Sequence, residues 1–241
     1  SGRFLAKQSG IFSGRKILEQ VYTALGGGVE VFWSVEDGQA FEEDSVLAKV
    51  KGPVSTLLSG ERVILNLLQH LTGIASTTQD LIQRLDDPDI KVVDTRKTLP
   101  GLRMIQKYAV RCGGGFNHRF RLDDGVMIKD NHIRAAGGIA KSVEMVRKQQ
   151  GHMIKIEIEV ETLNQVQQAV DAEVDVIMLD NQTPDQVKEL RKYIPKSIIV
   201  ELSGGINPDN IAGYRKCGAD IISVGWITHS VKACDISFYI D

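Results

Sequence analysis

The sequence has few cysteines, no long apolar run and no large excess of charge of either sign. Its three cysteines lack the CxxC spacing of redox and zinc motifs. An odd number of cysteines predicts free thiols in a reducing compartment, and therefore a cytoplasmic protein. No apolar stretch is long enough to span a membrane and no signal peptide is visible, so we expect no membrane association. The formal net charge of −2 argues against a nucleic-acid partner bound through bulk positive charge.

The sequence does contain enough hydrophobic residues, 42% of its 241 positions, to bury a full core. This length suits one large α/β domain, or a barrel with a small companion domain. The first residue is Ser1 rather than Met, so we expect a fragment of a longer chain.

Residues 1–60 are rich in glycine and predict a small α+β domain. Segments 29–33 and 45–50 predict strands, and Glu36-Asp37-Gly38 predicts a turn between them. This hairpin resembles those of biotinyl and lipoyl carrier domains, which present a modifiable lysine at the tip. The tip here, residues 42–44, has no lysine, which argues against a carrier role.

A connecting helical segment is predicted over residues 61–90. Four apolar residues recur there with helical spacing and share one face: Ile64, Leu67, Leu68 and Leu71. Gly73 weakens the helix but need not end it.

Residues 91–241 alternate between strand and helix patterns, which predicts βα units around a parallel sheet. Thr162 and Thr183 each begin a capping box, and Asn207 is expected to cap a further helix that stops at Gly218. The predicted strands lie near 92–96, 109–112, 125–129, 154–160, 174–179, 197–202 and 219–224. This number is close to what an α/β barrel needs, so we predict a closed or partly open barrel.

Polar clusters follow these strands, at the end where an α/β barrel builds its active site. Ser203-Gly204-Gly205 and Gly225 are phosphate-binding candidates, because glycine lets backbone N–H groups approach an anion. The alternative is that these glycines only form tight turns.

Three carboxylates form an acidic group: Glu157, Glu159 and Asp180. Glu157 and Glu159 share one face of their strand, and such carboxylates can hold Mg²⁺ or accept hydrogen bonds from ribose hydroxyls. The alternative is ion pairing with Lys129 or Arg119 that only neutralises the interior.

Four cations are expected to converge on the same barrel mouth: Arg96, Lys97, Arg119 and Lys129. Their mutual repulsion predicts an anionic ligand carrying carboxylates or phosphates, and His118 lies beside them. Arg103 and Lys107, by contrast, are expected on solvated helix faces.

These motifs resemble the quinolinate phosphoribosyltransferase family, over nearly the whole chain. The matching segments are Gly60–Arg62, Thr95–Thr98 with Pro100-Gly101, Gly113–Arg119, Lys129–His132, Glu157–Val160, Met178–Asn181, Ser203–Ile206 and Ser223–Gly225. The resemblance implies a partly open α/β barrel with a smaller N-terminal α+β sandwich domain. Family members typically begin some tens of residues earlier, with helical sequence that is absent here.

The resemblance also implies a reaction: quinolinate and phosphoribosyl pyrophosphate give nicotinate mononucleotide, pyrophosphate and CO₂, with Mg²⁺, in NAD biosynthesis. By position, Arg96, Lys97, His118 and Arg119 would hold the quinolinate carboxylates. Lys129, Glu159 and Asp180 would be catalytic on the sugar–pyrophosphate side, with Glu159 and Asp180 near the metal. Ser203, Gly204, Gly205 and Gly225 would bind phosphate. Arg62 would reach a neighbouring subunit's site in a homo-oligomer.

Two alternatives remain beside this prediction. One is a related transferase for another pyridine acid, against which Lys129-Asp130-Asn131-His132 favours quinolinate. The other is a barrel that binds ligand without turnover, against which the full cation set argues. Trp226 departs from the family pattern, because a small residue is common after the Gly225 position.

Overall fold

The computed structural model describes all residues, Ser1–Asp241, and they form two compact units. The first unit contains Ser1–Asp80, Thr98–Gly115 and Ile227–Asp241, and the second contains Leu81–Lys97 and Phe116–Trp226. This division differs from the contiguous segments 1–60, 61–90 and 91–241 expected from the sequence. Two segments account for most of the difference: Thr98–Gly115 belongs to the first unit, and the last segment of the chain returns to that unit and pairs with its first strand.

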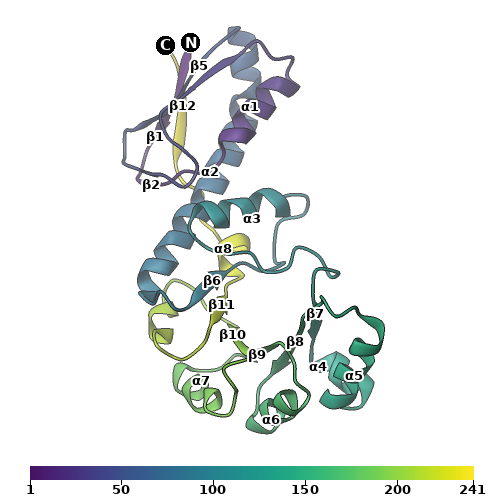
Figure 1. The fold of residues 1–241 in the computed structure, drawn as a ribbon. Helices are drawn as coiled ribbons and strands as arrows, with labels where there is room; N and C mark the ends of the chain where they lie inside the picture. The colour runs from purple at the N-terminus through teal and green to yellow at the C-terminus, as the bar shows by residue number, and fades with distance from the viewer. The chain divides into compact units, whose positions relative to one another are not determined.

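The first unit is built on an antiparallel sheet in the order β12-β1-β5-β3. Its strands are β1 (Gly2–Ala6), β3 (Glu30–Trp33), β5 (Val46–Lys51) and β12 (Ile236–Ile240). A second pair, β2 (Gly10–Ile11) and β4 (Ala40–Phe41), lies beside it, and α1 (Arg15–Ala24) completes the unit's N-terminal part. Gly2 pairs with Ile240, so the two chain ends lie side by side (Figure 1).

The long helix α2 spans Val54–Leu85. Ile64, Leu68 and Leu71 are fully buried, as the apolar spacing predicted, and Leu67 is half-buried. The helix continues past Gly73, where a Cβ would lie 2.3 Å from the carbonyl oxygen of Lys232, so only glycine permits this approach. Although α2 has 32 residues, no helix of the protein combines the length and apolarity needed to cross a membrane.

Helix α3 (Arg103–Cys112) occupies the region where a strand was expected at 109–112. That prediction is wrong, because Gln106, Ala109 and Val110 bury one helical face rather than alternating at period two. Lys107 was also expected on a solvated face, yet it is 0% exposed. Strand-like pairing occurs a few residues later, at Phe116.

The second unit contains a six-stranded parallel sheet in the order β6-β11-β10-β9-β8-β7. The strands are β6 (Lys91–Val93), β7 (Val126–Ile128), β8 (Ile156–Val160), β9 (Val176–Asp180), β10 (Ile199–Ser203) and β11 (Ile221–Ser223). No ladder joins β6 to β7, and a single parallel bridge from Val93 to Phe116 extends the β6 edge. The predicted partly open α/β barrel with a smaller N-terminal domain is therefore confirmed.

Helices follow the strands of this sheet and lie on its outer side (Figure 1). They are α4 (Asp130–Ala136), α5 (Ile139–Gln149), α6 (Leu163–Asp171) and α7 (Pro184–Arg191). The short α8 (Trp226–His229) follows β11 in the chain, and its residues from Ile227 onward belong to the first unit. The capping boxes predicted at Thr162 and Thr183 are both formed.

The helix predicted after Asn207 is replaced by a single 3₁₀ turn, η1 (Ile211–Tyr214). Asparagine side chains compete with helical hydrogen bonding there: Asn210 accepts from the Asn207 amide and donates to the Gly205 carbonyl. Gly218 has the left-handed backbone conformation that was expected of it, with φ of 92°.

Candidate active site

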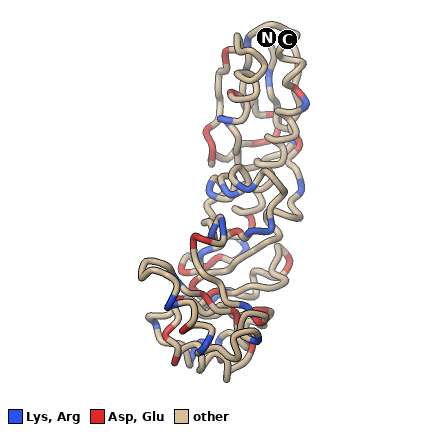
Figure 2. The backbone as a smooth tube through the Cα atoms, turned by 90° about the vertical axis from the view of Figure 1, so that its right-hand side faces the viewer, with Lys and Arg blue, Asp and Glu red and all other residues tan.

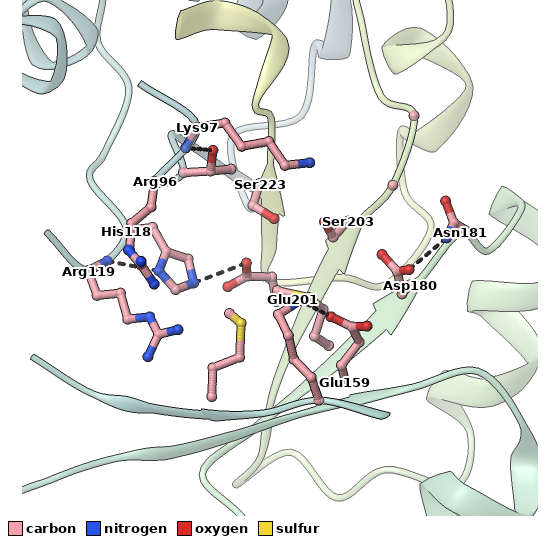
Figure 3. A pocket seen from close by; sticks show the side chains of 16 residues that line it. Arg96, Lys97, His118, Arg119, Glu159, Asp180, Asn181, Glu201, Ser203 and Ser223 are labelled. Carbon is pink, nitrogen blue, oxygen red and sulfur yellow. Dashed lines mark hydrogen bonds and ion pairs between the residues drawn. The ribbon is translucent and has the colours of Figure 1, made fainter. Parts of the chain in front are cut away.

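The carboxyl ends of the second unit's strands surround a cavity of about 420 Å³ (Figure 3). Because parallel strands end at one edge, residues distant in sequence meet there. Its lining residues are Thr95, Arg96, Lys97, His118, Arg119, Met127, Lys129, Glu159, Met178, Asp180, Asn181, Glu201, Ser203, Gly204, Gly205 and Ser223.

The charged side chains in this cavity are separated by sign, unlike those along the rest of the chain. Along the backbone, Lys and Arg are interleaved with Asp and Glu (Figure 2). Within the cavity, Arg96, His118 and Arg119 lie on one side, while Glu159 and Asp180 lie on the other (Figure 3). The site thus presents separate regions for an anion and for a group that carries or develops positive charge.

The basic side is held in place by backbone contacts. The Arg119 guanidinium donates to the Gly125 carbonyl at 2.6 Å. Burial lowers the pKa of Arg119, and the neighbouring charge of Arg96 lowers it further. Because the charges of the two guanidinium groups repel each other in a partly buried site, an anion bound between them is favoured.

The acidic side contains an ion pair between Lys129 Nζ and Glu159 Oε2, 2.5 Å apart. Asp180 accepts from Asn181 Nδ2 at 2.6 Å. Burial raises the pKa of Asp180, and the charge of Glu159 raises it further, so the two carboxylates repel each other. The ion pair with Lys129, which the sequence left open as an alternative for these carboxylates, is therefore formed by Glu159, and both residues line the cavity.

The loop after β10 supplies a backbone surface to the cavity. Gly204 has φ of 96°, and a Cβ there would lie 2.8 Å from the Asn181 amide nitrogen, so the loop can pass this close to Asn181 only with glycine. Ser203 and Gly205 line the cavity as predicted. Gly225 does not, and Ser223, two residues earlier, lines the cavity instead.

A buried cluster lies behind the basic side. His118 Nε2 is 3.3 Å from both Glu157 Oε2 and Glu201 Oε1, and these glutamates are only 7% and 3% exposed. The Arg119 backbone N–H donates to His118 Nδ1 at 2.8 Å, so that nitrogen has no proton and Nε2 carries it. The three side chains are close enough to surround a metal ion. However, a metal on Nε2 would require a proton on Nδ1, so this geometry does not fit a metal centre.

The cluster retains an additional proton at neutral pH. Burial lowers the pKa of His118, but the hydrogen bonds and charges of Glu157 and Glu201 outweigh burial and raise it to about 10. Burial, together with the charge of Glu201, raises the pKa of Glu157. Because His118 and Glu157 titrate as a coupled pair, the cluster as a whole holds the additional proton.

We expect the protein to lose stability between pH 7 and pH 10. Over that range the folded cluster binds a proton that an unfolded histidine, with a pKa near 6.5, has lost. The stabilisation is complete below pH 6.5 and disappears as the pH passes about 10. Thermal unfolding should show a melting temperature lower by roughly 3–8 °C at pH 10 than at pH 7. A His118→Asn variant should show a smaller decrease, and a wild-type melting temperature that stays constant would contradict this interpretation.

Most of the predicted site residues meet in this one cavity: Arg96, Lys97, His118, Arg119, Lys129, Glu159, Asp180, Ser203, Gly204 and Gly205. Arg62 lies on α2 in the first unit, where its side chain is 72% exposed. Glu201 was missed, and its signal was a lone carboxylate within an otherwise apolar strand. Asn181 was also missed, although it directly follows Asp180 at a strand end.

Comparison with known proteins supports one family along the whole chain. The family model "Quinolinate phosphoribosyl transferase, N-terminal domain" matches residues 1–72. The model "Quinolinate phosphoribosyl transferase, C-terminal domain" matches residues 74–239.

Individual relatives agree with these matches. The chain is 48% identical over 233 residues to a probable nicotinate-nucleotide pyrophosphorylase [carboxylating] of Bacillus subtilis, covering 97% of this chain and 81% of the relative. It is 37% identical over 256 residues to a mitochondrial quinolinate phosphoribosyltransferase [decarboxylating] of Nicotiana tabacum, covering 99% of this chain and 72% of the relative. The solved structure of the nicotinate-nucleotide pyrophosphorylase from Francisella tularensis superimposes with a TM-score of 0.95 at 38% identity, covering 98% of this chain and 84% of that one. The chain therefore belongs to the quinolinate phosphoribosyltransferase family.

Proposed function

We propose that this protein transfers the phosphoribosyl group of phosphoribosyl pyrophosphate to quinolinate. The products are nicotinate mononucleotide, pyrophosphate and CO₂, and the reaction serves NAD biosynthesis. The observation that carries the proposal is the cavity with cations on one side and carboxylates on the other (Figure 3). Membership of the family supplies the identity of the substrates.

The basic side fits the two carboxylates of quinolinate. Arg96 and Arg119 offer planar guanidinium groups that bind carboxylates through paired hydrogen bonds. Lys97 and His118 also line the cavity. Fixing both carboxylates orients the ring nitrogen toward the acidic side, so that binding contributes to catalysis by positioning.

The acidic side fits the reacting sugar. The anomeric carbon gains positive charge as pyrophosphate leaves, and the carboxylates of Glu159 and Asp180 stabilise that charge. Lys129 forms an ion pair with Glu159, and its positive charge also compensates the negative charge of the leaving pyrophosphate. The Ser203-Gly204-Gly205 loop offers backbone groups to the phosphate of the substrate.

We propose Mg²⁺ as the cofactor, held by Glu159 and Asp180. The donor set fits, because Mg²⁺ in nucleotide-type sites takes one or two carboxylates together with substrate phosphates. Burial raises the pKa of Asp180 and the charge of Glu159 raises it further, and a bound cation would relieve this repulsion between the carboxylates. When bound, Mg²⁺ neutralises charge on the pyrophosphate.

Loss of CO₂ follows from the chemistry of the alkylated ring. Attack by the ring nitrogen forms the bond to the sugar carbon and makes the nitrogen positive. The bond to the adjacent carboxylate can then break with its electron pair held next to that positive charge, and a proton from solvent restores the carbon. The protein holds the reactants and needs no covalent nucleophile.

We further propose a cytoplasmic homo-oligomer in which Arg62 enters a neighbouring subunit's site. The three free cysteines favour a reducing compartment. Arg62 is exposed on α2 between Leu58 and Val63, which are themselves 51% and 52% exposed, and an exposed apolar surface around a cation favours a protein interface.

Mixing two inactive variants tests this arrangement. Arg62→Ala and Lys129→Ala subunits should each be inactive, but a mixed dimer has one site with both native residues. After subunit exchange, activity should recover to about one quarter of the wild-type value, because half of the dimers are mixed and one of their two sites is intact. No recovery, despite mixed dimers seen by native mass spectrometry, would contradict a shared site.

The proposed reaction is tested by incubating the purified protein with quinolinate, phosphoribosyl pyrophosphate and Mg²⁺. Pyrophosphate and nicotinate mononucleotide should form in equal amounts, and omission of Mg²⁺ should prevent both. Nicotinate in place of quinolinate should give no product, since it lacks the second carboxylate. Turnover of nicotinate alone would favour a related transferase, and binding of quinolinate without turnover would favour a ligand-binding barrel.

A further inference from the structure

Asp94 is a fully buried carboxylate directly after β6, and the reaction proposed above does not use it. Its Oδ2 accepts from Asn117 Nδ2 at 2.5 Å, and its Oδ1 accepts from the His118 backbone N–H at 2.9 Å. Its own backbone N–H donates to the Phe116 carbonyl at 3.1 Å. Asp94 therefore binds the Phe116–His118 segment through both its backbone and its side chain.

These contacts join the two segments that carry the guanidinium groups of the site. Arg96 lies two residues after Asp94, and Arg119 lies two residues after Asn117. The segments are neighbours at the open side of the barrel, where the Val93–Phe116 bridge takes the place of a strand ladder. Backbone N–H groups donate across the two segments twice, from Phe116 to the Val92 carbonyl and from Asp94 to the Phe116 carbonyl. The Asp94 side chain adds two more hydrogen bonds that fix one segment against the other.

The two segments also repel each other. The pKa of Arg119 is lowered by burial and by the charge of Arg96, so the guanidinium groups interact unfavourably before any substrate binds. A buried carboxylate at the base of both segments opposes this repulsion with charge-assisted hydrogen bonds. Because Asn117 donates to one side-chain oxygen of Asp94 and the His118 N–H donates to the other, these two contacts require an acceptor at both oxygens.

We propose that Asp94 is a positioning residue that sets the separation of Arg96 and Arg119 for a dicarboxylate, with Asn117 as its partner. The inference deepens the proposed function, since it explains how the quinolinate end of the site is formed before binding. A preformed clamp does not have to order two repelling side chains when the substrate enters, and this favours affinity.

Exchange of the two side chains tests the proposal. Asn117→Asp places two carboxylates against each other, and it should raise KM for quinolinate by about 30-fold, with KM for phosphoribosyl pyrophosphate within about twofold of wild type. In the double variant Asp94→Asn with Asn117→Asp, the amide again donates to a carboxylate and still accepts from the His118 N–H. The net charge is that of the wild type, and KM for quinolinate should return to within about threefold of it.

For each variant, quinolinate binding is also measured by calorimetry, and folding is checked by thermal unfolding. Recovery of quinolinate affinity in the double variant supports the proposal. Equal changes in both KM values, or a double variant as impaired as Asn117→Asp, would overturn it, because a general loss of structure has no reason to be reversed by the exchange. If Asn117→Asp does not fold, Asp94→Asn alone decides: an increase in quinolinate KM of about fivefold supports the proposal, and an unchanged KM overturns it.

A separate measurement distinguishes failure of the proposed reaction from failure of the positioning role. If the wild-type protein does not turn over quinolinate, the reaction assignment fails. The exchange experiment is then read from calorimetric binding alone, with phthalate, another aromatic compound carrying adjacent carboxylates, as the ligand. Loss of phthalate binding in Asn117→Asp and its return in the double variant support the positioning role, and unchanged binding in both overturns it.

Discussion

Replacing Lys129 with Ala is expected to lower kcat by about 1,000-fold, so that no nicotinate mononucleotide is detected under standard assay conditions. The ammonium group lines the cavity and is 2.5 Å from Glu159. Without it, the carboxylates of Glu159 and Asp180 repel each other and the leaving pyrophosphate loses a compensating charge. The Lys129 side chain is 48% exposed, so its removal should leave the melting temperature within about 3 °C of wild type.

A matched control is available on α5. Lys148 forms an ion pair with Glu144 at the same distance, 2.5 Å, and lies outside the cavity. Lys148→Ala should retain wild-type pyrophosphate release. If Lys129→Ala also retained it, with the variant folded by thermal unfolding, Lys129 would have no catalytic role in this protein.

Replacing Arg119 with Ala is expected to reduce kcat/KM for quinolinate by at least about 100-fold. This guanidinium is one of the two that we propose hold the quinolinate carboxylates through paired hydrogen bonds, and an alanine leaves only Arg96 for that role. The fold should persist, because removing Arg119 also removes the repulsion between the two guanidinium groups. Steady-state kinetics with quinolinate as the varied substrate measures the effect.

The control for Arg119 is Arg121, two residues further along the same segment. Its side chain is 74% exposed and pairs with Asp123 at 3.5 Å, and it is absent from the cavity lining. Arg121→Ala should therefore leave kcat/KM unchanged. Similar losses in the two variants would mean that charge in this loop, rather than a specific carboxylate contact, determines affinity.

Local patterns in the sequence predicted the parts of the fold that depend on local interactions. The capping boxes at Thr162 and Thr183 form because each needs only four consecutive residues. The period-two pattern placed Glu157 and Glu159 on one face of β8, and both do turn inward. The sequence could not distinguish the roles of the two glutamates, because these depend on contacts with distant residues: Glu159 pairs with Lys129, whereas Glu157 contacts His118.

The features that the sequence did not predict depend on contacts between distant segments. Helix α3 was mistaken for a strand at 109–112 because Ala109-Val110 is apolar in either structure, and burial of Gln106 and Lys107 was not visible locally. Nothing in the sequence singles out Asp94, since its two donors lie 23 and 24 residues further along the chain. Glu201 likewise acquires its role from a contact with His118, which lies in a distant, irregular segment of the chain.

The pairing of β12 with β1 has a consequence for biosynthesis. The outer strand of the first unit's sheet is residues 236–240, while its neighbour is residues 2–6. During translation β1 is synthesised long before β12. The edge of β1 that pairs with β12 therefore stays unpaired until residue 240 has been synthesised. Removing the last six residues should therefore leave β1 as an exposed edge, and such a truncated protein is expected to aggregate.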